Sequence, residues 1–175
     1  MITLPQFLEN IDNAQIDASL TPGLKLRAGR LWFDVLSDDV VRGIRQIWEQ
    51  EIFQRQQKFI IYGAGTFLRD VLNAMPTSSY EHLLVGFVDR RFGEDFSNYP
   101  APVYPPSHLS QRDYELVVAF HPFAEPDMFK AIKVHAPQDV EVYLFYSSPP
   151  CKALMERETT KRIDALRGRL QEIED

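Results

Sequence analysis

Short apolar runs rich in β-forming residues alternate with helical stretches through the middle of this chain, from residue 57 to residue 148. The four longest runs are 59–62, 83–88, 116–120 and 140–145. Three of them are almost continuously apolar, which is typical of strands buried on both faces of a sheet. Helical candidates lie between them at 67–75 and 126–135, and a Pro-rich segment around Val103 predicts a short edge strand. This order of elements predicts a parallel sheet with right-handed crossovers.

Residues 1–56 are helical in character and predict an N-terminal helical extension. A short apolar stripe begins at Leu4, and a stronger helix is expected to begin at Ser37. The carboxylates of Asp38 and Asp39 then lie in the first helical turn, where negative charge is favourable. Apolar residues recur at helical spacing after them, so one face of this helix is expected to pack on the core.

Residues 149–175 predict a single C-terminal helix, because two serines and two prolines before Cys151 mark a clear break. Thr159 and four apolar residues after it then alternate steps of four and three, which is typical of a coiled-coil seam; they are Ile163, Leu166, Leu170 and Ile173. The seam spans barely two heptads, so docking on its own domain and homodimer formation both stay open. The expected division is therefore 1–56, 57–148 and 149–175.

Composition narrows the class of function. The net charge is -6 and the pI is near 5.2, which argues against a general binder of nucleic acid or of membrane surfaces. Cys151 is the only cysteine, so an internal disulfide and a cysteine-based zinc site are both excluded. The first residues lack the pattern of a signal peptide, and no stretch approaches the roughly 18 apolar residues of a membrane span. A cytoplasmic location is expected.

The first apolar run leads directly into the turn Gly63-Ala64-Gly65-Thr66, which is expected to open a helix. Gly63 tolerates positive φ, and Gly65 has no Cβ to keep a phosphate away. The N–H groups and the positive dipole end of the helix point at the same place, which predicts an anion seat. The third glycine of a dinucleotide fingerprint is replaced by Leu68, which weakens the case for a dinucleotide in its usual pose.

Three charged residues follow the second apolar run. Asp89 lies at the distance from the turn where a carboxylate can accept hydrogen bonds from a ribose diol or a base. Arg90 and Arg91 are placed to meet a phosphate, including the 2′-phosphate of NADP. The alternative is that Asp89 only caps a turn and that both arginines are solvated.

His121 follows the third long run and is expected to face the same crevice as Gly63. Its intrinsic pKa lies near neutrality, so it could donate to a phosphate or act as an acid or base. The alternative is that it caps the start of the next helix.

The combined motifs resemble a Rossmann-like nucleotide-binding module over residues 57–146. They are Ile61-Tyr62-Gly63-Ala64-Gly65, Val85-Gly86-Phe87-Val88-Asp89, the Pro-rich segment 102–109 and the run 113–119. The module is similar to the N-terminal domain of bacterial sugar O-acyltransferases, to the C-terminal domain of sugar C-methyltransferases and to the nucleotide-binding domain of epimerase-like proteins of polysaccharide biosynthesis. The acyltransferase resemblance implies that Gly63, Gly65 and Asp89 line a nucleotide pocket.

Neither of the transferase domains that accompany this module in those families is recognisable in this sequence. The Tyr-x-x-x-Lys pair of short-chain dehydrogenases and the G-x-S-x-G motif are also absent. The favoured expectation is a nucleotide or nucleotide-sugar binding protein without chemistry of its own, linked to surface-polysaccharide or sugar-nucleotide metabolism. A homodimer and a separate catalytic partner protein both stay open as its partners. The alternatives are a scaffold with a degenerate site, in which Arg90 or Leu68 fills the crevice, and a small NAD(P)-dependent oxidoreductase that uses His121.

Overall fold

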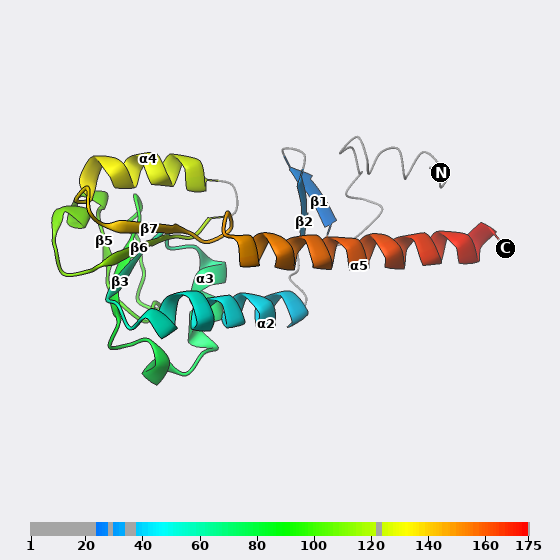
Figure 1. Cartoon of the computed structure of the whole chain (residues 1–175), viewed down its shortest axis with the longest axis horizontal. Coiled ribbons are helices and arrows are strands. Elements are labelled where there is room, and N and C mark those ends of the chain that lie inside the picture. The colour runs from blue at the N-terminus through cyan, green and yellow to red at the C-terminus, as the bar shows by residue number, and fades with distance from the viewer. Residues whose placement is uncertain (1–23, 28–29, 34–37, 122–123, 175) are drawn as a thin grey trace. The chain divides into compact units, whose positions relative to one another are not determined.

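The computed structural model of the chain describes residues 24–27, 30–33, 38–121 and 124–174. The chain divides into two compact units, one of residues 43–152 and one of residues 1–42 with 153–175. The first unit contains the sheet shown in Figure 1 and all of the predicted ligand-binding residues.

A five-stranded parallel sheet forms the centre of this unit, in the order β5-β4-β3-β6-β7. Numbered from β3, this is the order of the first five strands of a doubly wound dinucleotide-binding sheet. The predicted α/β class with a parallel, Rossmann-like sheet is therefore confirmed. The strands are β3 (Phe59–Tyr62), β4 (Leu84–Val88), β5 (Val103–Tyr104), β6 (Leu116–Ala119) and β7 (Glu141–Leu144).

The two central strands are apolar because both of their faces are covered. Every residue of β3 and of β6 is buried, and their register runs from Phe59 opposite Leu116 to Tyr62 opposite Ala119. Successive side chains of each strand point to opposite faces of the sheet, so they pack into different layers of the core. The sequence pattern of continuous apolar runs follows directly from this position in the sheet.

One face of the sheet packs against an aromatic cluster. It includes Trp48, the first residue of a π-helical turn (η2, Trp48–Ile52) that directly continues α2 (Asp38–Ile47). The Trp48 ring centroid lies 6.1 Å from that of Phe59, 5.7 Å from that of Phe120 and 5.1 Å from that of Phe145. The predicted helix with an apolar face is thus confirmed, and its C-terminal end packs on the sheet.

The opposite face is covered by α4 (Glu125–His135) and by a 3-10 turn, η5 (Pro106–Ser110). Ile132 of α4 and Leu109 of η5 are fully buried and belong to one cluster with Ile60 and Tyr62 of β3. α3 (Thr66–Asn73) follows β3 and contributes Leu68, Val71 and Leu72 to the buried core. The helices expected at 67–75 and 126–135 are therefore both present, with slightly different ends.

The N-terminal extension is not helical throughout, which corrects the expectation for residues 1–56. β1 (Leu24–Arg27) and β2 (Arg30–Phe33) form an antiparallel hairpin, with Leu24 opposite Phe33 and Arg27 opposite Arg30. In β1 apolar and basic residues alternate with the period of two that suits a strand, whereas β2 has one basic residue followed by three apolar ones. The apolar stripe beginning at Leu4 and the expected helix start at Ser37 lie outside the described residues.

The C-terminal helix is confirmed as α5 (Pro149–Glu174). The structure describes the backbone of its predicted coiled-coil seam but not most of the seam's side chains, so self-association stays a prediction. Among the helices that the structure describes, none combines the length and the apolar character needed to cross a membrane.

Candidate functional site

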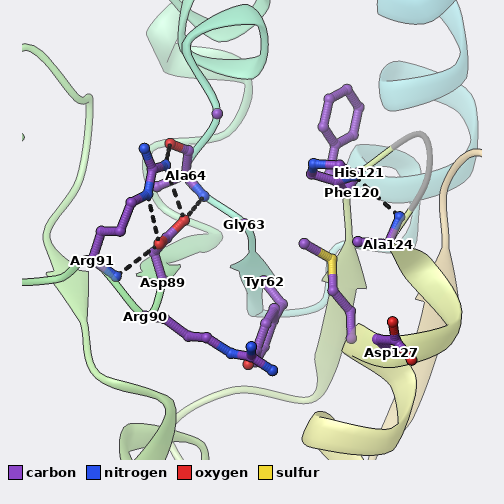
Figure 2. Close-up of a pocket in the computed structure, with 12 residues that line it drawn as sticks. Tyr62, Gly63, Ala64, Asp89, Arg90, Arg91, Phe120, His121, Ala124 and Asp127 are labelled. Atoms are coloured by element: carbon purple, nitrogen blue, oxygen red, sulfur yellow. Dashed lines mark hydrogen bonds and ion pairs between the residues drawn. The ribbon is translucent and has the colours of Figure 1, made fainter.

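A cleft of about 550 Å³ opens where the carboxyl ends of β3, β4 and β6 come together. β3 and β6 are neighbours in the sheet although they are not consecutive strands, so this is the point where the strand order reverses. Open α/β sheets bind their ligands at such a point. Six of the seven predicted site residues line the cleft (Figure 2), namely Gly63, Ala64, Gly65, Asp89, Arg90 and His121.

Thr66, the seventh predicted residue, begins α3 and is not among the residues that line the cleft. Leu68 is fully buried in the core and also does not line the cleft. Leu68, one of the two residues that the scaffold alternative placed in the crevice, therefore does not fill it. Arg90 does line the cleft, and the 550 Å³ is the space that remains beside its side chain.

Gly63 and Gly65 have different reasons to be glycine. Gly63 has φ +110°, and a Cβ there would lie 3.0 Å from the backbone oxygen of Phe120. Its N–H donates to the carbonyl of Val88 over 2.8 Å, which ties the turn to the end of β4. Gly65 has an ordinary extended conformation, and a Cβ there would meet no atom of the described residues within 4 Å. The fold therefore requires glycine at 63, whereas at 65 glycine keeps a space open.

The N-terminus of α3 adjoins that space. Gly65 is the N-cap residue, and no side chain of the described residues caps the helix with a hydrogen bond. The first helical hydrogen bond runs from the N–H of Arg69 to the carbonyl of Gly65, over 3.2 Å. The N–H groups of the first turn have no carbonyl of their own helix to bond, and the helix dipole adds positive potential there. This arrangement suits a phosphate or another anion.

The Asp89 carboxylate bonds to the protein itself. Its Oδ2 accepts the N–H of Ala64 over 2.8 Å, and its Oδ1 accepts the backbone N–H of Arg91 over 2.9 Å. Arg91 also donates from Nε to Oδ1 over 3.2 Å and from Nη2 to the carbonyl of Ala64 over 3.2 Å. The hydroxyl of Tyr99 donates to the same carbonyl over 2.8 Å. Asp89, Arg91 and Tyr99 together hold the glycine turn in place, which favours the capping interpretation of Asp89.

These contacts set the charge of Asp89. Burial by itself raises the pKa of Asp89, but the N–H groups of Arg91 and Ala64 and the Arg91 guanidinium outweigh it and hold the pKa below its ordinary value. The carboxylate is therefore ionised at neutral pH. The same pair raises the pKa of Arg91, through the hydrogen bond to Asp89 and its charge.

The stability that Asp89 contributes is expected to depend on pH. Because its pKa is lower in the folded state than its ordinary value of 3.8, the unfolded chain takes up the proton first as the pH falls. Wild type should therefore exceed Asp89→Asn in stability at pH 7, and the difference should shrink as the pH falls below about 4. Urea denaturation at a series of pH values measures this difference in unfolding free energy. Asp139→Asn, which removes an exposed carboxylate, is the control. If the stability difference between wild type and Asp89→Asn stays constant down to about pH 3, the hydrogen bonds and ion pair of Asp89 do not lower its pKa as described.

His121 lies at the cleft and also at the start of α4. Its Nδ1 accepts the N–H of Ala124, the N-cap residue of that helix, over 3.1 Å, as Figure 2 shows. Pro122 and Phe123 lie outside the described residues. Desolvation lowers the pKa of His121, and the nearby Asp89 carboxylate offsets this only in part. The ring is thus held neutral with its proton on Nε2, which agrees with the capping alternative and leaves His121 in the cleft wall.

Several residues of the site were not singled out from the sequence. Tyr62, Phe120, Asp127 and Met128 line the cleft, and Tyr99 supports the turn from outside it. Tyr62 and Phe120 could have been found, since each directly precedes a predicted site residue at the end of a strand. Tyr99 could not, because it lies in an irregular segment whose path no periodic pattern predicts.

Within the part of the chain that the structure describes, no group of three or more His, Cys, Asp or Glu side chains is placed to hold a metal ion. Comparison of the chain with protein-family models, with curated proteins and with solved structures found no match.

Proposed function

We propose that this protein binds a nucleotide or a nucleotide sugar, with a phosphate of the ligand held at the Gly63–Gly65 turn and the first turn of α3. The observation that carries the proposal is the cleft at the carboxyl ends of β3, β4 and β6, where this turn and the uncapped helix meet. Its volume of about 550 Å³ is in the range of small-molecule sites.

The walls of the cleft support a ligand with both charged and apolar parts. Phe120 and Met128 provide apolar surface, and the guanidinium of Arg90 provides a positive charge on the side of β4. A phosphate at the turn gains from the N–H groups and from the dipole of α3, while a ring system gains from contact with Phe120. A nucleotide contains both groups, a phosphate and an aromatic ring system.

Binding is favoured over hydride transfer by the state of two residues. The Asp89 carboxylate, which would hold the ribose diol in a dinucleotide site, is bonded to Ala64 and Arg91. His121 is held neutral, and its Nδ1 already accepts a hydrogen bond. We therefore propose a binding protein of sugar-nucleotide or surface-polysaccharide metabolism that works with a separate catalytic partner, rather than an NAD(P)-dependent oxidoreductase.

A panel of ligands tests the proposal by thermal shift. It contains NAD, NADP, UDP-sugars, dTDP-sugars and S-adenosylmethionine. A ligand present at about 100 times its Kd should add about 2.7 kcal/mol to the free energy of unfolding. For a chain of this size that corresponds to a Tm increase of about 5–10 °C. The absence of a shift with every member of the panel would contradict nucleotide binding.

The variant Gly65→Asp separates the site from the fold. A carboxylate at the N-cap can accept the first N–H groups of α3, so the free protein should be as stable as wild type or more stable by about 0.5–1 kcal/mol. The same carboxylate occupies and repels the phosphate position, so the ligand-induced shift should disappear. Gly93→Asp is the matched control, since a Cβ at Gly93 meets no atom within 4 Å and Gly93 does not line the cleft. A full ligand shift in Gly65→Asp would place the ligand elsewhere.

A further inference from the structure

Arg90 places an exposed cation in the wall of the cleft, directly after the end of β4. In Figure 2 its side chain runs away from the hydrogen bonds between Asp89 and Ala64 and toward the side of Tyr62. Its neighbour Arg91 instead turns back to Asp89, with Nε 3.2 Å from Oδ1 of the carboxylate. The two consecutive arginines therefore have different surroundings, and the guanidinium of Arg90 can be reached from the cleft.

The carboxylate beside Arg90 has little capacity left for a ligand. A carboxylate offers about four acceptor positions. Oδ1 of Asp89 accepts the backbone N–H and the Nε of Arg91, and Oδ2 accepts the N–H of Ala64 and, over 3.4 Å, Nη2 of Arg91. Only 13% of the Asp89 side chain is exposed. The end of β4 therefore presents a guanidinium to a ligand in place of a carboxylate, which suits an anionic group better than a ribose diol.

The charges around the cleft favour a second negative group on the ligand. Each of the two carboxylates that line the cleft has its own cation: Asp89 pairs with Arg91, and Asp127 lies 3.6 Å from the Nζ of Lys130. Arg90 forms no ion pair with the residues that the structure describes. A phosphate at the glycine turn is balanced by the N-terminus of α3, so it leaves the charge of Arg90 for another anion.

We infer that the ligand carries a second anionic group, a phosphate or carboxylate substituent, which pairs with Arg90 while the first phosphate is held at the glycine turn. The inference rests on the proposed function and narrows its ligands to nucleotides with such a substituent, on the ribose or on an attached sugar. Asp127 lies in the first turn of α4, so its charge disfavours the second group on that side of the cleft. The β4 side, where Arg90 lies, is favoured instead.

The test uses two matched pairs of ligands in calorimetric titrations at low ionic strength. UDP-glucuronate differs from UDP-glucose by a carboxylate, and NADP differs from NAD by a 2′-phosphate. Wild type should bind the anionic member of at least one pair about five- to tenfold more tightly, and that pair identifies the group. Arg90→Gln should reduce this preference to about twofold or less. Raising the salt concentration to about 0.5 M should also weaken the preference of wild type, because an exposed ion pair is screened.

Arg112→Gln is the matched control. It removes the same charge from an exposed arginine that pairs with Asp139 and does not line the cleft, so it should keep the preference of wild type. If wild type binds both members of each pair equally and Gly65→Asp abolishes that binding, the second anionic group is overturned and the proposed function stands. A preference that survives in Arg90→Gln overturns the role of Arg90. If wild type binds none of the four ligands, both proposals fail.

Discussion

Replacing Trp48 with alanine is expected to lower the free energy of unfolding by about 3–5 kcal/mol, the largest effect that we predict for a single substitution. Trp48 is fully buried, and its ring stacks on that of Phe145 with centroids 5.1 Å apart. The ring centroids of Phe53 and Phe59 lie 6.0 and 6.1 Å from that of Trp48. Removing the indole leaves a cavity between η2 and the sheet that these rigid rings cannot close. Chemical denaturation of the free protein measures the loss.

Trp48→Phe is the matched control. It keeps an aromatic ring in the cluster and removes the indole Nε1, which is buried without a hydrogen-bond partner among the described residues. The cost should therefore stay below about 1.5 kcal/mol. Trp48 also contacts Phe120, at 5.7 Å between ring centroids, and Phe120 lines the cleft. Trp48→Ala should thus weaken ligand binding as well as the fold. An alanine variant that loses less than about 1 kcal/mol would show that the cluster repacks around the gap.

Replacing Gly63 with alanine is expected to destabilise the protein by about 2–4 kcal/mol. The residue has φ +110°, a conformation that side chains with a Cβ rarely adopt. The new Cβ would also lie 3.0 Å from the carbonyl oxygen of Phe120, which belongs to the backbone and cannot rotate away. The Met128 methyl group at 3.1 Å is flexible and can move, so it adds little.

Gly65→Ala is the control for this effect, with the same change two residues further on. It adds a methyl group at a position with ordinary backbone angles, where the described part of the chain has no atom within 4 Å. Its unfolding free energy should remain within about 1 kcal/mol of wild type. Equal stabilities of the two variants in chemical denaturation would mean that the turn has a different conformation in solution.

The central sheet could be predicted because its strands are buried on both faces. Continuous apolar runs at 59–62 and 116–120 admit few other structures at that length, and the helical segments between the runs imply parallel crossovers. The hairpin of β1 and β2 was missed because only the four residues of β1 alternate apolar and basic side chains, while β2 does not alternate. So short an alternation is a weak signal beside a longer helical pattern.

The place of the site followed from the same reasoning. Gly63, Asp89 and His121 each follow a strand, and the carboxyl ends of parallel strands lie along one edge of the sheet. Their convergence on one cleft could therefore be predicted from the sequence. Their hydrogen-bond partners could not, because the Ala64 N–H that Asp89 accepts lies 25 residues earlier in the chain.

The sequence by itself determined the parallel sheet, the glycine turn and the edge at which they meet, because local apolar patterns and backbone sterics are properties of neighbouring residues. Only the tertiary structure decided that Asp89 closes the turn, that His121 caps α4 and that the Tyr62 hydroxyl has no hydrogen-bond partner among the described residues. Hydrogen bonds of this kind depend on which atoms approach within about 3 Å across separate elements. That proximity is set by packing of the whole domain, and no single segment of the chain encodes it.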